Sequence, residues 1–374
     1  MKIVVTGGAG FIGSNLAKHF EDLGHEVLVI DCFNSGERFS NGNFKAFGDY
    51  RNLLDFSGEI YCGDICDIKT LEKIADFAPH AIFHEAAISD TTVSEQDAIM
   101  RTNINAFVDI MNLAKKLGSK LVYASSGAVY GDAPSPQGIW ASEKPKNAYG
   151  FSKFMMDKIA SNHCVTNPSA HVVGLRYFNV YGKSEYFKGK TASMVLQFGL
   201  QMLKSGIARL FEGSDKICRD FVYIRDIVAA NEAALKAKSG VYNAATGKAR
   251  SFESIVDILA EVLNINVKKE RKWLWEFSKR LIVGVSVFSL LVTIFVLFMI
   301  YKTQDMNYIS NLIEAVADIF KVAVVGYLIK AGAENVVKVS RSCNCEQTTE
   351  ESQEEDTTTL TDEVNELESN TSDV

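Results

Sequence analysis

The chain has 374 residues, of which 47% are hydrophobic and 23% are charged, and its formal net charge at pH 7 is −7. This length is sufficient for two domains, and the acidic balance argues against a general nucleic-acid-binding protein. The seven cysteines, an odd number spread along the chain, indicate reduced thiols rather than a disulfide framework, and we expect neither a functional thiol nor a metal site.

The first predicted element is a short apolar strand, Lys2–Thr6, rich in valine and isoleucine. A predicted helix from about Phe11 to Leu23 follows, and Gly24 is a typical helix stop. Between strand and helix, the spacing G-x-x-G-x-x-G is formed by Gly7, Gly10 and Gly13. Glycines there permit a tight turn that lets the backbone approach a pyrophosphate, and the helix N-terminus offers free amides to its charge. This unit therefore predicts a dinucleotide-binding site.

A second predicted strand, Glu26–Ile30, is followed by Asp31, which comes eighteen residues after Gly13. An acidic residue at this point can accept hydrogen bonds from the adenosine ribose of a nicotinamide dinucleotide. Asp31 alone favours NAD, whereas Arg38 could instead hold the 2′-phosphate of NADP. These residues by themselves leave the choice of cofactor open.

The alternation of strands and helices continues along the chain. Strand-like runs are found at Glu59–Cys62, His80–His84, Lys120–Ser125 and His171–Tyr177. Helical runs between them include Thr102–Leu117 and Tyr149–Asn162. This order predicts an α/β fold with a doubly wound parallel sheet, the Rossmann arrangement.

A candidate catalytic group follows the fifth of the predicted strands. Ser126 lies at the carboxyl end of that strand, the edge of such a sheet at which ligands bind. Tyr149 and Lys153 come next, and their i, i+4 spacing puts them on one face of the predicted helix. A free tyrosine, with a pKa of about 10, is a poor base, but a neighbouring ammonium and an oxidised nicotinamide favour its phenolate. Tyr149 would then accept a hydroxyl proton while hydride leaves for the cofactor, with Ser126 hydrogen-bonded to the same substrate oxygen.

Because of the glycine motif and the group of Ser126, Tyr149 and Lys153, residues 1 to about 266 resemble the extended short-chain dehydrogenase/reductase family. Two stretches occur across that family, Arg176–Gly182 and Arg219–Tyr223. Others are similar to its ADP-L-glycero-D-manno-heptose 6-epimerase branch, namely His84–Thr92, Phe187–Gly189 with Ala192 and Ser193, and Leu210–Ser214. The resemblance implies a nucleotide-sugar epimerase that oxidises and reduces carbon 6 of the heptose with bound NADP, ranked before NAD.

The resemblance also implies roles for individual residues. Tyr149 and Lys188 would be the two acid/base groups, because hydride leaves one face of the sugar and returns to the other. The cofactor would be lined by Phe11, Ile12, Asp31, Cys32, Arg38, Glu85, Ala86, Ala87, Ile88, Ser89, Lys153 and Val180. The nucleotide-sugar would be held by Asn179, Lys190, Gln197, Phe211, Glu212, Gly213, Ser214 and Arg219.

Two other activities of the same family compete with this interpretation. A nucleotide-sugar epimerase acting at carbon 4 is the nearer alternative. A 4,6-dehydratase would place an Asp-Glu pair after the catalytic hydroxyl, whereas this chain has Gly127 and Ala128 there. We expect an ADP-sugar as substrate, a homo-oligomeric assembly and no nucleic-acid partner.

The resemblance ends near Val267. It covers an epimerase-like domain over residues 1–266, whose substrate part would lie mainly in 180–225 and 245–266. The family would continue with a further substrate segment that includes an aromatic residue in contact with the sugar, and we find no counterpart of it. We therefore expect a truncated substrate domain, followed by an unrelated piece.

The remaining residues have a different composition. Six basic residues in Lys268–Arg280 precede twenty uncharged residues at Leu281–Ile300, the length needed to cross about 30 Å of hydrocarbon. Tyr308–Ile329 is a second apolar stretch, which carries three charges and could be a second membrane span or a surface helix. We predict a membrane-associated helical segment over 267–340 and a disordered acidic tail over 341–374.

The position of the basic cluster predicts where the domain lies. Because basic residues accumulate on the cytoplasmic side of a span, the catalytic domain would be cytoplasmic and tethered to the inner face of the membrane through 281–300. The alternative from another class is a membrane-anchored protein without enzymatic activity, whose impaired epimerase fold binds cofactor but cannot close over substrate.

Overall fold

The computed structural model describes residues 1–272 and, beyond them, short runs and single positions of helix between Val283 and Lys321. The chain divides into two compact units, Met1–Glu270 and Arg271–Val374. The first unit contains all the elements predicted for the nucleotide-binding fold. The predicted basic segment begins with a described strand, β12 (Lys268–Lys272), which pairs with β8 (Ile207–Phe211).

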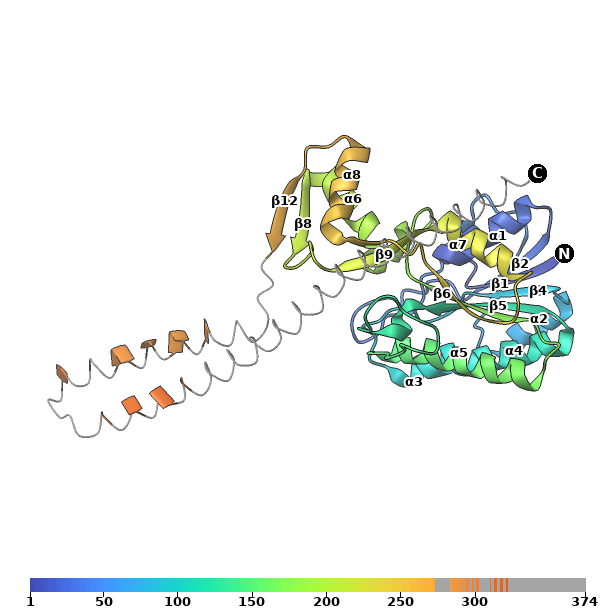
Figure 1. The fold of residues 1–374 in the computed structure, drawn as a ribbon, viewed down its shortest axis with the longest axis horizontal. Coiled ribbons are helices and arrows are strands. Elements are labelled where there is room, and N and C mark those ends of the chain that lie inside the picture. Colours follow the sequence, from blue (N-terminus) through green and yellow to red (C-terminus); the bar gives the residue numbers. More distant parts are fainter. Residues whose placement is uncertain are drawn as a thin grey trace, which may run out of the picture. The chain divides into compact units, whose positions relative to one another are not determined.

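A seven-stranded sheet forms the centre of the first unit, with strand order β10-β6-β5-β4-β1-β2-β3 (Figure 1). Every pair of neighbours in this sheet runs parallel. The predicted doubly wound parallel sheet is therefore confirmed. Its strands are β1 (Lys2–Thr6), β2 (Glu26–Asp31), β3 (Glu59–Cys62), β4 (Ala81–His84), β5 (Lys120–Ser126), β6 (Val172–Tyr177) and β10 (Gly240–Ala244).

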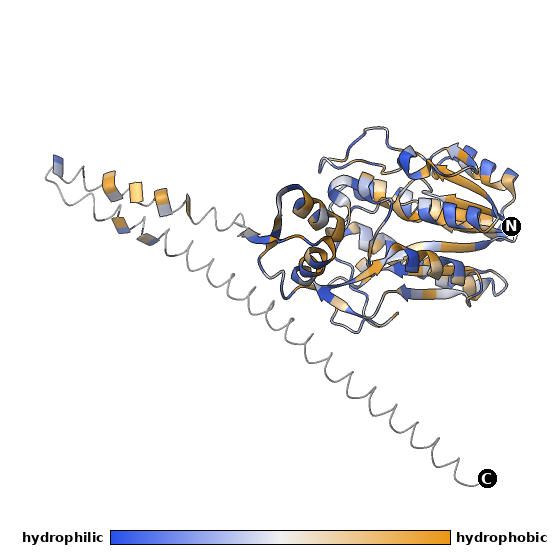
Figure 2. Ribbon diagram, turned by 90° about the horizontal axis from the view of Figure 1, so that it is seen from above, coloured by the Kyte–Doolittle hydropathy of each residue, from blue (hydrophilic) through white to orange (hydrophobic). Residues whose placement is uncertain are grey.

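Helices cover both faces of this sheet. On one face, α1 and α7 pack on a core that includes Phe20, Phe83 and Leu175, and on the other, α4 and α5 pack on Phe107 and Tyr123. Apolar residues are concentrated in the strands between these layers (Figure 2). The helices concerned are α1 (Phe11–Asp22), α2 (Ile68–Phe77), α4 (Ala106–Leu117), α5 (Ala148–Thr166) and α7 (Ile224–Ala234).

The predicted helix Thr102–Leu117 has an irregular beginning. It is preceded by the short helix α3 (Gln96–Ile99) and begins as one π-helical turn, η2 (Met100–Asn105), before α4 continues in regular geometry. Sequence periodicity could not predict this turn, because a π turn is a local widening that tertiary contacts stabilise. Asn103 lies in this turn and is fully buried.

The smaller part of the first unit follows β6 in the chain. It contains a three-stranded sheet of order β11-β9-β7 and the β12-β8 pair, with α6 and α8 packed around Phe198 and Val256. Short helical turns complete the unit: η1 (Tyr50–Leu53), η3 (Gly127–Tyr130) and η4 (Tyr186–Thr191). The remaining elements are β7 (Asn179–Tyr181), β9 (Cys218–Tyr223), β11 (Ala249–Ser251), α6 (Met194–Ser205) and α8 (Phe252–Leu263).

The predictions for the C-terminal part fall largely outside the described residues. The predicted span 281–300 and the second stretch 308–329 are described only at scattered helical positions, and the predicted acidic tail 341–374 lies wholly outside them. Among the residues that are described, no helix combines the length and the apolar character that crossing a bilayer requires.

Candidate active site

The glycine-rich turn between β1 and α1 is tightly packed. Gly7 has a φ of +67°, and a Cβ there would lie 2.8 Å from the amide nitrogen of Ala86. A Cβ on Gly13 would collide with the carbonyl oxygen of Gly7. Phe11 is the first residue of α1, and Gly10 precedes it without a side-chain cap. The first amides of α1 therefore have no side-chain acceptor at the cap position, which is the arrangement that binds a pyrophosphate.

Asp31 is the last residue of β2, at the predicted position, but its carboxylate is occupied within the protein. It is 7% exposed, and its two oxygens accept hydrogen bonds from the amides of Ala9 at 3.0 Å and Phe33 at 2.8 Å. Burial raises the pKa of Asp31, and these two hydrogen bonds oppose the rise. Asp31 thus fixes the glycine turn to the end of β2.

Asn103 connects residues 85–89, which are predicted to line the cofactor, to the start of α5. Its side-chain oxygen accepts from the amide of Ile88 at 2.8 Å, and its Nδ2 donates to the carbonyl of Ile88 at 3.0 Å and to Ser152 Oγ at 2.9 Å. Ser152 in turn donates to the carbonyl of Tyr149 at 2.7 Å. This series of hydrogen bonds fixes residues 85–89 and the candidate catalytic Tyr149 relative to each other.

Glu85, one of the predicted cofactor-binding residues, lies next to the ionisable side chains of Tyr177 and Lys153. Tyr177 donates from its hydroxyl to Glu85 Oε1 at 2.9 Å, and Asn231 donates to the Tyr177 oxygen at 2.8 Å. Desolvation raises the pKa of Glu85 to about 7, although Tyr177 and the ammonium of Lys153 both lower it. The carboxyl group of Glu85 therefore titrates within the physiological range.

The structure brings together the candidate catalytic residues that the sequence predicted. Ser126 ends β5 and its Oγ accepts from the amide of Ala128 at 3.1 Å, while Tyr149 lies in the first turn of α5. The side chain of Asn147 caps this helix by accepting from the amide of Gly150 at 2.7 Å. A Cβ on Gly150 would lie 2.7 Å from the Ala128 carbonyl, so the start of α5 packs directly on η3.

The electrostatics of Tyr149 and Lys153 differ from the simple sequence expectation. Lys153 is 1% exposed, its Nζ donates to the carbonyl of Ala124 at 2.7 Å, and burial lowers its pKa to about 8. Burial also raises the pKa of Tyr149, a hydrogen bond with Ser126 lowers it, and the charge of Glu85 raises it. The phenolate therefore requires an additional positive charge, which an oxidised nicotinamide carries.

Lys188, the predicted second acid/base, lies in η4. Its ammonium is 5.7 Å from the ring centroid of Phe11, the first residue of α1. Desolvation lowers the pKa of Lys188, and the neighbouring Glu185 opposes this effect. Glu185 is itself fixed, because its carboxylate accepts from the amides of Gly182 at 2.9 Å and Ser193 at 2.7 Å. A partly desolvated lysine is thus held beside the glycine turn.

The remaining predicted cofactor residues are near the end of β2 and in β7. Cys32 has an exposed surface, but partial desolvation of its thiol, together with the nearby carboxylates of Asp31 and Asp64, raises the pKa of that thiol to about 12. The guanidinium of Arg38 lies 3.8 Å from the ring centroid of Phe44 and donates to the carbonyl of Gly42 at 2.7 Å. Val180 packs against the main core. Arg38 itself is exposed.

The predicted substrate residues are distributed over the smaller part of the unit. Asn179 begins β7, Lys190 is exposed in η4, and Gln197 of α6 donates to the carbonyl of Ala192 at 2.7 Å. The others surround the turn between β8 and β9 and comprise Phe211, the exposed Glu212, Gly213 with a φ of +81°, the fully buried Ser214, and the exposed Arg219. No single contact joins all of these residues in the described part of the chain.

Sequence reasoning did not identify several residues that shape the site. Arg51 is one, since its guanidinium lies 3.8 Å from the ring centroid of Phe187 and pairs with Asp49 at 2.7 Å. Asn103 and Tyr177 are others, and both act through hydrogen bonds to segments that are distant in sequence. The residues around them in the sequence do not reveal these partners.

Comparison with known proteins gives a consistent result. Residues 3–245 match the NAD dependent epimerase/dehydratase family. The chain is similar to the ADP-L-glycero-D-manno-heptose-6-epimerase of Helicobacter pylori, with 42% identity, a TM-score of 0.67, and coverage of 73% of this chain and 85% of that one.

It is also similar to two UDP-sugar epimerases at lower identity. The UDP-glucose 4-epimerase of Thermus thermophilus, in complex with NAD, is 26% identical, with a TM-score of 0.62 and coverage of 74% and 88%. The UDP-N-acetylglucosamine 4-epimerase of Methanobrevibacter ruminantium, in complex with UDP-N-acetylmuramic acid, is 26% identical, with a TM-score of 0.63 and coverage of 74% and 86%. The predicted resemblance to nucleotide-sugar epimerases is confirmed.

Proposed function

Because this chain belongs to the NAD dependent epimerase/dehydratase family and is a nicotinamide-dependent nucleotide-sugar epimerase, we propose that its reaction interconverts ADP-D-glycero-D-manno-heptose and ADP-L-glycero-D-manno-heptose. The observation that carries this choice is the 42% identity to a heptose 6-epimerase, against 26% for the two 4-epimerases. The lysine at 188, which the resemblance makes a second acid/base, lies beside the start of α1 and adds to this support.

The proposed mechanism uses a proton partner for each face of the sugar. When bound, an oxidised nicotinamide supplies a hydride acceptor for carbon 6 and later returns the hydride. Tyr149 takes the proton from the carbon-6 hydroxyl while Ser126 hydrogen-bonds the same oxygen, and a ketone is formed. After the ketone turns in the site, hydride returns to its opposite face and Lys188 donates a proton to the oxygen. Tyr149 then releases its proton to solvent and Lys188 regains one from it, so the enzyme returns to its starting state and neither atoms nor electrons are consumed overall.

NADP is the proposed cofactor. Both carboxylate oxygens of Asp31 already accept backbone hydrogen bonds, which reduces their capacity to bind the ribose hydroxyls of NAD, and the exposed Arg38 lies seven residues further along. We expect Arg38→Ala to raise the KM for NADP about tenfold or more while changing that for NAD little, the loss of one charge-assisted contact. Lys45→Ala, which removes an exposed pair with Glu37, is the matched control. An unchanged ratio of the two constants would contradict the assignment.

The proposal is tested with the purified full-length chain and a defined substrate. We expect ADP-D-glycero-D-manno-heptose to be converted to an equilibrium mixture of both epimers, followed by NMR, without net consumption of NADP. Turnover of UDP-glucose but not of the ADP-heptose would support a carbon-4 epimerase instead. A folded sample that binds NADP and converts neither sugar would support the non-enzymatic alternative.

We also propose that residues 281–300 attach the enzyme to a membrane, which rests on twenty consecutive uncharged residues preceded by a basic cluster. In membranes from cells that express the full chain, we expect the protein to resist extraction by alkaline carbonate. Replacing both Leu290 and Leu291 with arginine, at about 2.5–3.5 kcal/mol each, should release it, and the corresponding double alanine variant should not. Wild-type protein that is released by the same treatment would contradict the proposal.

A further inference from the structure

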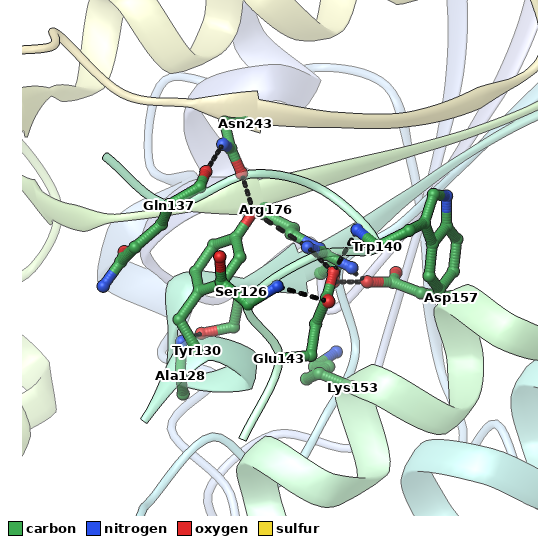
Figure 3. A network of polar contacts seen from close by, with 12 residues as sticks. Ser126, Ala128, Tyr130, Gln137, Trp140, Glu143, Lys153, Asp157, Arg176 and Asn243 are labelled. Carbon is green, nitrogen blue, oxygen red and sulfur yellow. Dashed lines mark hydrogen bonds and ion pairs between the residues drawn. The ribbon is translucent and has the colours of Figure 1, made fainter. Parts of the chain in front are cut away.

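A buried ionic network surrounds Arg176, a residue with no role in the mechanism above (Figure 3). Arg176 lies on β6 and is 0% exposed. Its Nε donates to Asp157 Oδ2 at 2.9 Å and its Nη1 donates to Glu143 Oε1 at 2.6 Å. Burying one guanidinium and two carboxylates costs free energy unless all three are paired, so the network depends on each member.

The Asp157 arm of the network joins α5 to the end of β5. Asp157 follows Lys153 by four residues, so the two side chains share one face of α5. Its carboxylate also accepts from the hydroxyls of Tyr123 at 2.9 Å and Ser125 at 2.9 Å. Ser125 directly precedes Ser126, so Asp157 relates the strand end that carries Ser126 to the helix that carries Tyr149 and Lys153.

The Glu143 arm holds the segment between these two catalytic elements. Residues 131–147, which we call the neck loop, begin after η3 and end at α5. Glu143 accepts from the amides of Trp140 at 2.6 Å and Ser142 at 3.2 Å, and the amide of Lys144 donates to the carbonyl of Val129 at 2.9 Å. Glu143 and Lys144 thus close the loop at its base, where the guanidinium of Arg176 is located.

A third connection extends from Arg176 to β10. Its Nη1 also donates to the hydroxyl of Tyr130 at 2.8 Å, and that hydroxyl donates to Asn243 Oδ1 at 2.6 Å. Asn243 donates to the carbonyl of Gln137 in the neck loop at 3.1 Å. Arg176 is therefore shared by η3, α5, the neck loop and the sheet, and no other side chain in the network has this central position (Figure 3).

We propose that Arg176 is a positioning residue for the reaction: through Asp157 and Glu143, it sets the geometry of Ser126, Tyr149 and Lys153 relative to one another. This inference rests on the proposed function, because it assigns a role to the same site. The network balances charge as well as geometry, since Asp157 faces two cations, Arg176 and Lys153.

The two arms predict different effects, which a purely structural role does not. Asp157→Asn removes a negative charge beside Lys153, so the pKa of Lys153 falls from about 8 to a lower value. Since the ammonium is the active form, the high-pH limb of kcat moves to lower pH by about one unit or more. Glu143→Gln lowers kcat about tenfold to a hundredfold by displacing the loop, without moving this limb.

This interpretation of the pH profiles requires that the other titratable and charged groups facing Lys153 and Asp157 keep their charge. Those that face Lys153 or Asp157 are His84 from β4, Glu85 directly after that strand, Tyr123 from β5, and Arg176 from β6. His84 stays neutral because burial and Lys153 lower its pKa to about 3. Arg176→Lys keeps the charge but loses the forked donor geometry, so we expect a lower kcat with an unmoved limb.

The experiment compares pH profiles of kcat for the wild type and these three variants in the full-length chain. Glu232→Gln, which breaks the pair between α1 and α7 at His19, is the control and should match the wild type. Equal losses of kcat in all variants, with no movement of the limb in Asp157→Asn, would overturn the proposal.

If the wild type turns over no sugar, NMR of lysines labelled at the ε-carbon in the NADP-bound chain still measures the pKa of Lys153, with Lys153→Arg giving its assignment. A downward shift only in Asp157→Asn then supports the positioning role, and the absence of any shift overturns it.

Discussion

Replacing Tyr149 with phenylalanine is expected to lower kcat for heptose epimerisation by about 10²- to 10⁴-fold, the usual contribution of a positioned acid/base. The substitution keeps the ring and removes only the hydroxyl that exchanges a proton with the substrate. Because the carbonyl of Tyr149 is held by Ser152, the start of α5 should keep its position, and the affinity for NADP should change little. Steady-state kinetics and a fluorescence titration with NADP measure the two quantities.

A matched control exists at the sheet edge. Tyr242→Phe on β10 removes a hydroxyl that donates to the carbonyl of Lys238 at 2.9 Å, and this residue is 39% exposed and outside the site. It should retain wild-type turnover. If Tyr149→Phe retained turnover within twofold of the wild type, Tyr149 could not be the acid/base, and the proton partner would have to be sought among Lys188 and Glu85.

The parts of the fold that follow from local sequence were predictable. Five apolar runs predicted strands that end within one residue of their observed ends, because these strands are mostly buried between helical layers and have few alternatives. Tyr149 and Lys153 were predictable as a pair because the helical period alone puts them on one face, and α5 contains both.

Features that depend on partners far along the chain were not predictable. The stretch Arg176–Gly182 is one of those that carry the resemblance to the family. Nothing in the sequence, however, indicates that Arg176 pairs with Asp157 and Glu143, which are separated from it by 19 and 33 residues. A buried ion pair has no periodicity, and only the folded chain shows that all its members are enclosed together.

The electrostatics of the site could be predicted only in part from the sequence. The sequence predicts that the ammonium of Lys153 and an oxidised nicotinamide together favour the phenolate of Tyr149, and the folded chain adds burial and Glu85, which raise the pKa of Tyr149 and oppose them. Burial depends on the packing of α5 against the sheet, so the balance between a nearby cation and the loss of solvent requires the structure.

Replacing Lys188 with methionine is the second change with a large expected effect. Methionine preserves the length and apolar stem of the side chain beside Phe11 but cannot exchange a proton. We expect kcat for net epimerisation to fall about 10²- to 10⁴-fold. The lowered pKa of Lys188, caused by its partial burial, brings the lysine closer to the working pH and makes it a better proton donor and acceptor than an exposed lysine.

The two bases should be distinguishable by the epimer that each variant still oxidises. If Tyr149 serves one face and Lys188 the other, Lys188→Met should reduce bound NADP with only one of the two ADP-heptose epimers, and Tyr149→Phe with only the other. The absorbance of the reduced nicotinamide in a single turnover reports this directly. Lys183→Met, at an exposed lysine five residues earlier, should behave as the wild type. Oxidation of both epimers by Lys188→Met, with neither oxidised by Tyr149→Phe, would mean that Tyr149 serves both faces, and Lys188 would then have no acid/base role in the reaction.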